Sequence, residues 1–304
     1  MDLIWLEDYL ALSETLNFSK AAEARHVTQP AFSRRIRALE EWVGAPLFVR
    51  TTHSVALTRA GEHFHTQAEI LIRALHQLRR ETLDVAGRGA GPLSIAATHV
   101  LSFTFFPKWV RSSEKILALG NLNLISDSMS ACERMMLRGD VSFLLCHYHR
   151  SMGSRLDTRQ FKSIVVGTDT LVPLSVAAAG RKPRWSLQND ETVPYLAYSQ
   201  QSGLGRIVAS QLAKRDLKKI FTSHLAATLL SMVRSGDGVA WLPRTLAEDD
   251  IAAGSLVEAG DARSSVPIEI RLFRPAARQR QEVEALWSAF EAAKVGVSSG
   301  ATEG

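Results

Sequence analysis

The stretch HVTQPAFSRRIRALEEWVG, at residues 26–44, has the spacing of an α-helix with one buried face. Its apolar residues recur at alternating intervals of four and three: Phe32, Ile36, Leu39 and Val43. This periodicity places them in a single stripe along a helix. Thr28 can cap the helix, Pro30 lies in the first turn where no N–H is needed, and Gly44 can end it. The sequence therefore predicts a helix between Thr28 and Gly44.

The polar side chains of this helix point away from the apolar stripe. At about 100° per residue, Ser33, Arg34 and Arg37 project outward, and Gln29 lies on the flank nearest Ser33. Arginine pairs with guanine or phosphate, glutamine with adenine, and serine with either, so this face suits DNA. A solvated surface with scattered charges is the ordinary alternative.

Basic and acidic residues balance over residues 1–90, but they are segregated. No acid interrupts residues 24–39, whereas four acids lie in the first helical segment and two more at residues 40–41. We therefore expect a locally positive face, which the net charge of +5 does not reveal. The basic residues of the uninterrupted segment are Arg25, Arg34, Arg35 and Arg37.

The segments on either side predict a winged helix-turn-helix. WLEDYLALSETL has the spacing of an amphipathic helix, and FSKAAEARHV predicts a short second helix with Ser19 as its N-cap. Two helices joined by a tight turn, the second showing arginines outward, are typical of a helix-turn-helix. APLFVRTTHSVALTRAG then predicts two short strands, at 47–50 and 54–57, around a polar turn. This wing would place three side chains against a phosphate backbone: Arg50, Thr51 and His53.

A long helix is predicted over residues 59–87, with Thr58 as its cap and a glycine-rich exit at 87–91. Six residues along it alternate intervals of four and three: Phe64, Ala68, Leu71, Leu75, Leu78 and Thr82. A repeat of about 3.5 residues predicts a coiled-coil seam between two copies of the chain. The alternative is a helix that packs on its own domain.

From residue 92 onward, short apolar runs alternate with helical segments, which predicts an α/β domain with largely parallel strands. Ligands of open α/β sheets bind at the carboxyl ends of the strands, often at helix N-termini. Small or polar residues follow the expected strands at these positions: Thr98, His99, Ser102, Ser126, Ser128, His147, Ser199, Gln200, Gln201 and Ser202. Serines there can also cap helices without contacting a ligand.

Several other kinds of site are not favoured. Cys146 and His147 are expected on opposite faces of a strand, so CHYHR is a poor metal site, and we expect no metal or cofactor. Cys132 and Cys146 lack the basic surroundings of a reactive thiolate pair. GLGR at 203–206 is not a dinucleotide fingerprint, and no catalytic triad pattern occurs, so we expect no enzyme. With no membrane-spanning run and no signal-peptide pattern, we expect a cytoplasmic protein.

The first 60 residues closely resemble LysR-type transcriptional regulators. The resemblance rests on Ala21-Ala22, VTQPAFSRRIRALE, GAPLFVR and ALTRAG in that order and spacing, and later on GDGVAWLP at 236–243. It implies that the recognition helix and wing contact double-stranded DNA, and His53 departs from the family's usual arginine. The expected DNA-binding residues are Ser19, Thr28, Gln29, Pro30, Ser33, Arg34, Arg37, Arg50, Thr51 and His53.

The resemblance also implies an architecture. The DNA-binding domain would cover 1–58, the dimerising linker helix 59–87, a hinge 88–91, the effector domain 92–295 and a disordered tail 296–304. The effector domain would resemble periplasmic binding proteins, with lobe I at 92–163 and 266–295, lobe II at 164–265, and a cleft between them. A small polar effector, such as a carboxylate or aromatic acid, would bind in that cleft, and the dimers would assemble into tetramers. The expected effector-binding residues are Thr98, His99, Ser102, Ser128, His147, Ser199, Gln200 and Ser202.

The segments FSKAAEARHVTQPAFSRRIRALE and GDGVAWLP together resemble the hypochlorite-responsive members of this family, in which methionine oxidation is the proposed switch. At two of their sensing positions this chain has Leu204 and Leu225, which cannot form a sulfoxide. Four other methionines are expected in the core: Met129, Met135, Met136 and Met232. A regulator switched by oxidation, and an architectural DNA-binding protein with a vestigial pocket, are the alternatives to a ligand-responsive regulator.

Overall fold

The computed structural model describes residues 2–51, 54–86, 92–112, 122–152, 156, 159–188, 192–212 and 217–298. The chain divides into an N-terminal unit, formed mainly by residues 1–91, and a C-terminal unit of residues 92–136 and 140–304. The predicted hinge at 88–91 lies outside the described residues. The predicted tail is wrong at its start, because the last helix continues through residue 298.

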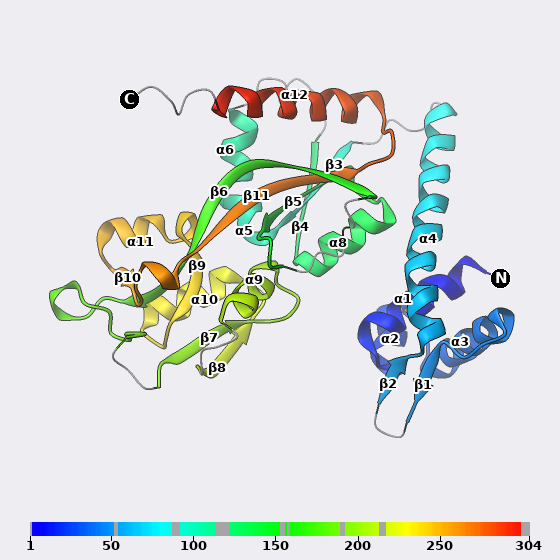
Figure 1. Cartoon of the computed structure of the whole chain (residues 1–304), viewed down its shortest axis with the longest axis horizontal. Helices are drawn as coiled ribbons and strands as arrows, with labels where there is room; N and C mark the ends of the chain where they lie inside the picture. Colours follow the sequence, from blue (N-terminus) through cyan, green and yellow to red (C-terminus); the bar gives the residue numbers. More distant parts are fainter. Residues whose placement is uncertain are drawn as a thin grey trace. The chain divides into compact units, whose positions relative to one another are not determined.

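The N-terminal unit is a winged helix-turn-helix followed by one long helix, as the sequence predicts (Figure 1). The antiparallel strands β1 and β2 form the wing, with Phe48 opposite Leu57. The elements are α1 (Leu3–Thr15), α2 (Phe18–Ala24), α3 (Gln29–Val43), β1 (Phe48–Arg50), β2 (Val55–Leu57) and α4 (Arg59–Val85).

The predicted stripe of α3 forms the centre of this unit's core. Phe32, Ile36 and Leu39 are fully buried among side chains of α1 and α2, and Val43 packs at the edge. Tyr9 of α1 donates a hydrogen bond of 2.7 Å to the carbonyl oxygen of Gly61 in α4. The start of α4 is thereby fixed to the helix-turn-helix.

Two predicted helix caps differ in the structure. The N-cap of α2 is Asn17, whose side chain accepts a hydrogen bond of 3.0 Å from the Lys20 N–H. Ser19 lies inside the first turn, because the helix begins at Phe18, one residue before it. Thr28 occupies the N-cap of α3 but makes no side-chain capping bond, whereas Thr58 caps α4 as predicted by accepting from Gly61 N at 2.9 Å.

The predicted seam of α4 divides into two parts. Phe64 and Ala68, in its first half, pack into the core of the same unit together with Ile72. These residues behave as the alternative predicted, a helix packed on its own domain. In the second half the apolar side chains are exposed, by 43% at Leu71, 40% at Leu75 and 60% at Leu78.

The C-terminal unit is a mixed α/β domain (Figure 1). Its strands are β3 (Leu93–Thr98), β4 (Leu122–Asp127), β5 (Phe143–Tyr148), β6 (Phe161–Val176), β7 (Pro194–Tyr198), β8 (Lys218–Ser223), β9 (Ala240–Pro243), β10 (Leu256–Glu258) and β11 (Val266–Pro275). Its helices are α5 (His99–Thr104), α6 (Phe106–Arg111), α8 (Met129–Arg138), α9 (Gly203–Leu212), α10 (Ala226–Ser235), α11 (Glu248–Ala253) and α12 (Gln281–Ser298). Short 3-10 turns lie at Ala179–Arg181, Arg244–Leu246 and Ala262–Ser264.

The prediction of largely parallel strands is wrong for the main sheet. Its order is β10-β6-β11-β5-β3-β4, with β9 also paired to β6. Strand β3 is parallel to β4 and β5, but the two longest strands, β6 and β11, run antiparallel to each other. The chain leaves along β6 and returns along β11, so these neighbours must run in opposite directions. A second, parallel pair consists of β7 and β8.

The strands β6 and β11, here called the hinge strands, connect two regions of the domain. Strand β11 pairs with β5 only from Glu269 to Phe273, whereas β6 pairs with β9 only from Leu171 to Leu174. The register between the hinge strands shifts between Ile270 and Arg271, which marks a β-bulge. Bulges bend a strand pair, so the ribbon turns where it passes between the two regions.

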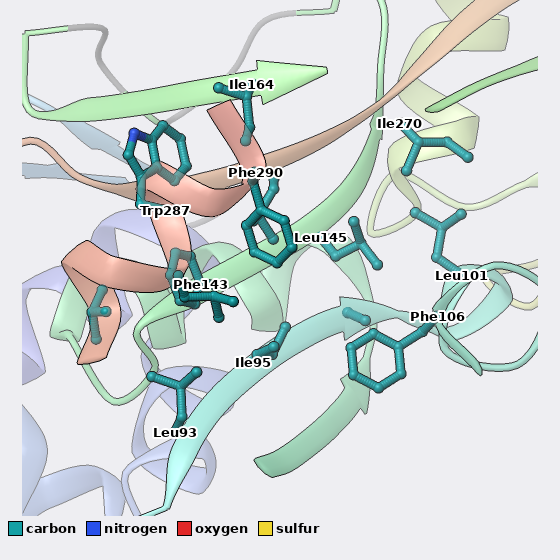
Figure 2. Close-up of a cluster of buried hydrophobic side chains, with 14 residues drawn as sticks. Leu93, Ile95, Leu101, Phe106, Phe143, Leu145, Ile164, Ile270, Trp287 and Phe290 are labelled. Carbon is teal, nitrogen blue, oxygen red and sulfur yellow. The ribbon is translucent and has the colours of Figure 1, made fainter. Parts of the chain in front are cut away.

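One end of this ribbon is covered by the last helix, α12. Trp287 and Phe290 of α12 lie in a buried cluster with Phe143 and Leu145 of β5 and Ile164 of β6 (Figure 2). The rings of Phe143 and Trp287 lie in nearly parallel planes, 7° apart, with centroids separated by 6.4 Å. This core holds the end of the chain against β5 and leaves the carboxyl ends of β3, β4 and β5 available for a site.

Candidate nucleic-acid interface and effector cleft

The outward face of α3 carries the predicted arginines. Arg34 and Arg37 are exposed and form no hydrogen bond or ion pair with any residue that the structure describes. Gln29 is also exposed, and Ser33 is half-buried beside them. The two guanidinium groups are therefore available to an external partner.

The two other basic residues of the segment are neutralised, which corrects the predicted run of four. Arg25 Nε lies 2.7 Å from Asp8 Oδ1, and Arg35 Nη1 lies 3.2 Å from Asp8 Oδ2. Arg25 also pairs with Glu7 at 2.5 Å. Asp8 is fully buried and ties α2 and α3 to α1. Sequence reasoning missed this role because the ion pairs join separate helices.

Glu40 organises the wing. Its Oε1 accepts hydrogen bonds from the backbone N–H groups of Leu47 at 2.9 Å and Phe48 at 3.1 Å, and its Oε2 accepts from Arg50 at 2.8 Å. The Arg50 guanidinium also lies 4.7 Å from the centroid of the Phe18 ring. Arg50 is thus exposed but already paired, a restraint that the sequence did not indicate.

The tip of the wing is described only in part. The Ser54 N–H donates a hydrogen bond of 3.0 Å to Thr51 Oγ1, which closes the turn. His53 lies outside the described residues. Thr28 and Pro30, at the start of α3, are exposed beside Gln29.

In the C-terminal unit, five of the eight predicted effector residues line one small cavity of about 30 Å³: Thr98, His99, Ser128, His147 and Ser202. Ser102, Ser199 and Gln200 do not line it. Ser102 Oγ donates to the carbonyl oxygen of His99 at 2.7 Å, Ser199 lies in the turn after β7, and the Gln200 side chain is exposed. The expectation that ligands bind at strand ends located this cavity correctly. Helix α5 was not expected, and within it Ser102 bonds to the backbone of its own helix.

Two polar atoms on the cavity wall have no partner among the described residues. These buried atoms are Thr98 Oγ1 and His147 Nε2. Burial lowers the pKa of His147 to about 4, against the opposing effect of the Asp169 carboxylate, so the ring is neutral at pH 7. Unpartnered buried polar atoms are uncommon in folded proteins, and here both belong to the wall of a cavity.

Three helices begin at this cavity, since Met129 of α8, Gly203 of α9 and Ala226 of α10 line it. Helix N-termini carry partial positive charge and favour anions. Ser128 and Ser202 also serve as caps, accepting from Ala131 N at 3.4 Å and Gly205 N at 3.3 Å. Capping and cavity lining therefore coincide at these two serines.

His224 also lines the cavity, although sequence reasoning missed it. Its ring centroid lies 5.9 Å from that of His99. It follows β8, a strand of exposed and half-buried residues that carries no clear apolar run. Asp127 lines the cavity as well, and its Oδ1 accepts a hydrogen bond of 2.6 Å from Ser128 N.

An ion pair joins α9 to α8, two helices whose first residues line the cavity. Arg206 of α9 donates to Glu133 of α8 at 2.9 Å and to Ser130 Oγ at 2.8 Å. Glu133 is fully buried. On the same helix α9, Ser210 Oγ lies 2.7 Å from Ser151 Oγ, which follows β5. These contacts link α9 to the region of β3–β5.

The sites that the sequence disfavoured have the following properties in the structure. Cys132 and Cys146 are buried free thiols, and burial raises the pKa of both, to about 12 for Cys132. Among the described residues, no group of three or more His, Cys, Asp or Glu side chains is arranged to hold a metal ion. None of the described helices has the length and hydropathy needed to span a lipid bilayer.

Comparison with known proteins assigns both parts of the chain to one family. Residues 3–62 match the bacterial regulatory helix-turn-helix of the LysR family, and residues 86–294 match the LysR substrate-binding domain. The HTH-type transcriptional regulator YjiE of Escherichia coli is 29% identical over 286 residues, covering 93% of this chain and 92% of that protein.

Solved structures give the same result. DarR of Vibrio fischeri in complex with DNA is 30% identical, with a TM-score of 0.54, and the match covers 95% of this chain and 98% of that one. Full-length HypT of Salmonella typhimurium, a hypochlorite-specific LysR-type regulator, is 28% identical with a TM-score of 0.58, covering 97% and 99%. These relatives are named as regulators of transcription rather than as enzymes. The chain belongs to the LysR-type transcriptional regulators, which combine a DNA-binding helix-turn-helix with an effector-binding domain.

Proposed function

We propose that this regulator binds a small carboxylate in the cavity at the ends of β3, β4 and β5, and that this ligand controls its action on DNA. The observation that carries the proposal is the pair of unpartnered buried atoms, Thr98 Oγ1 and His147 Nε2, on the cavity wall. A hydroxyl and a neutral imidazole can donate to carboxylate oxygens. The helix N-termini favour the same charge.

The size of the cavity limits the ligand. A volume of about 30 Å³ holds little more than a water or a very small anion. A short carboxylate therefore fits the closed cleft best, whereas an aromatic acid requires the Arg206–Glu133 pair to open. Binding shifts the protein between open and closed forms only as far as the ligand prefers one of them.

For DNA, Arg34 and Arg37 are proposed to contact bases or phosphates in the major groove, while Gln29 and Ser33 adjust sequence preference. The wing residues Arg50, Thr51 and His53 would contact the phosphate backbone, together with the start of α3 at Thr28 and Pro30 and with Ser19 of α2. We place the protein in the cytoplasm, because a regulator of this bacterial family must reach the DNA that it binds.

Self-association is proposed through α4. Leu71, Leu75 and Leu78 expose one apolar stripe on its second half, and an antiparallel copy of α4 would cover it. Two DNA-binding domains held at fixed separation bind a two-fold symmetric site more tightly than one. Contacts between effector domains would then join two dimers into a tetramer. The proposed divisions remain 1–58, 59–87, 88–91 and 92–295, with the two lobes meeting along the hinge strands.

The experiment uses the full-length protein, a fragment from upstream of its own gene, and two probes, acetate and benzoate. Acetate is expected to raise the thermal midpoint and change the DNase footprint, and Thr98→Val is expected to weaken acetate binding at least tenfold. Thr222→Val, an exposed threonine of β8, is the matched control. If neither probe alters the midpoint or footprint, or if Thr98→Val binds acetate as well as the wild type, the carboxylate proposal is wrong.

A second candidate, regulation by oxidation, is favoured by one observation. Met129 lines the cavity, and a Cβ on Gly203 would lie 3.2 Å from its Cγ, so a sulfoxide there would disturb the start of α9. Met136 is buried as the sequence predicted, whereas Met135 and Met232 are only half-buried. To test this candidate, the protein is treated with hypochlorite and oxidised methionines are located by peptide mass spectrometry. If Met129 is the switch, hypochlorite changes the DNA affinity of the wild type but not that of Met129→Leu.

A further inference from the structure

A second and much larger cavity lies along the hinge strands. Its volume is about 940 Å³, within the range of small-molecule sites. Thr168, Asp169 and Thr170 of β6 and residues 267–269 of β11 contribute to its wall. It also reaches Tyr148 at the end of β5 and the segment 244–252 that includes α11. Both regions joined by the hinge strands therefore contribute to a single cavity.

Part of the wall is apolar and suits a hydrophobic body. Pro267 and Ile268 of β11 and Ile251 of α11 line it together with the Tyr148 ring. The Arg271 guanidinium lies 4.3 Å from the centroid of that ring and holds its position. A ligand with apolar surface would gain affinity by covering these side chains.

Most charged groups on the wall are already satisfied. Arg271 Nε donates to Glu269 at 2.6 Å, and Asp169 accepts from Thr245 Oγ1 at 2.5 Å. Arg244 is paired with Glu258. These groups shape the cavity but offer little charge to a ligand.

Two charged groups on the wall are not satisfied. Arg150, directly after β5, and Glu248, the first residue of α11, make no hydrogen bond or ion pair within the part of the chain that the structure describes. They come from different regions of the domain. A molecule with one charge could pair with only one of them, whereas a molecule with opposite charges at its two ends could pair with both.

We infer that this cavity binds a bipolar zwitterion, an apolar body with a carboxylate at one end and an ammonium at the other. The carboxylate would pair with Arg150 and the ammonium with Glu248, while the body covers Ile268 and Tyr148. This site is separate from the cleft cavity and does not depend on the carboxylate proposed there.

The position of the second cavity connects it to the first. Successive residues of a strand face opposite sides of a sheet, and on β5 His147 lines the cleft cavity whereas Tyr148 lines the second one. Asp169, on the wall of the second cavity, is also close enough to His147 to act on it electrostatically. A ligand that bridges both regions at the hinge strands would fix their angle and thereby change the cleft.

The test measures binding to the full-length protein by calorimetry with three probes that share one body. They are 4-(aminomethyl)benzoate, 4-methylbenzoate, which lacks the ammonium, and 4-methylbenzylamine, which lacks the carboxylate. We expect the zwitterion to bind at least tenfold more tightly than either singly charged probe. Equal affinity for the zwitterion and one of the others, or no binding of the zwitterion, would overturn the inference.

Variants locate the site. Arg150→Gln and Glu248→Gln are each expected to weaken zwitterion binding at least tenfold, to the level of the matching singly charged probe. Arg263→Gln and Asp249→Asn remove similar exposed charges that do not line the cavity and are expected to have no effect. If Thr98→Val abolishes zwitterion binding while Arg150→Gln and Glu248→Gln do not change it, the ligand occupies the cleft cavity and the second site is wrong.

Discussion

Arg206 and Glu133 join α9 to α8 across the effector cleft, with Arg206 Nη1 2.9 Å from Glu133 Oε1. Glu133 is fully buried, and Arg206 also bonds Ser130. In the proposed function, this pair holds the cleft closed around its small cavity before any ligand enters.

Glu133→Gln is expected to weaken the closed form. The change removes the charge that partners Arg206, and losing one charged hydrogen-bond partner costs about 1–3 kcal/mol of folding stability. We expect a lower thermal midpoint and faster hydrogen exchange at the backbone amides of α9. Asp250→Asn, which breaks the exposed Arg234–Asp250 pair, is the control and should change stability little. Unchanged exchange in α9 would show that the pair does not hold the cleft closed.

Asp8→Asn is expected to destabilise the N-terminal unit strongly. Asp8 is buried against Arg25 and Arg35, and breaking a buried ion pair on one side typically costs about 3–5 kcal/mol. Circular dichroism during heating would show the loss of the helix-turn-helix. Glu41→Gln, an exposed acid on α3, should leave the transition in place. A transition in Asp8→Asn equal to the wild type would contradict the role given to Asp8.

Stability is expected to fall as the pH falls from about 6.5 to about 4. The pKa of His147 is lowered to about 4 by burial, so between these values the unfolded chain binds a proton that the folded chain does not. Proton binding therefore stabilises the unfolded state, by about 3 kcal/mol once the pH reaches 4. This loss in the free energy of unfolding is absent above pH 6.5, where the stability is highest. His147→Gln should flatten the dependence of the thermal midpoint on pH, and an equally steep profile in that variant would contradict the assignment.

Leu75→Glu is expected to prevent dimer formation. It places a charge in the middle of the exposed stripe of Leu71, Leu75 and Leu78, which a second copy would have to bury. Sedimentation velocity should show a shift from dimer or tetramer to smaller species. Thr66→Glu adds the same charge to an exposed residue of α4 outside the stripe. If both variants sediment like the wild type, α4 does not form the interface.

The sequence predicted the N-terminal unit well because its signals are local. The stripe of Phe32, Ile36 and Leu39 follows helical periodicity, and Gly44 marks the end of α3. The errors concern contacts between elements. Arg25 and Arg35 look free in the sequence, but Asp8 lies beside both only after the helices pack.

The effector domain was predicted less completely for the same reason. An apolar run indicates a strand but not its direction, so the antiparallel hinge strands were not foreseen. Short elements such as α5 and α11, six residues each, carry too little periodicity to be recognised. Thr98 and His147 were found because they directly follow or end apolar strands, whereas His224 follows a strand without such a run. Arg206 and Glu133 had no sequence signal, because their pairing depends on how α9 packs against α8.

The central claim is that the free arginines of α3 bind DNA, and the most direct test measures the affinity of Arg34→Ala for a fragment from upstream of the protein's own gene. The account predicts binding that weakens as salt increases, and a loss of about 1–3 kcal/mol in the variant without a change in thermal stability. Arg263→Ala, an exposed arginine of the C-terminal unit, should bind as the wild type does. Fluorescence anisotropy at several salt concentrations that gives equal affinities for Arg34→Ala and the wild type, or no salt-dependent binding at all, would contradict it.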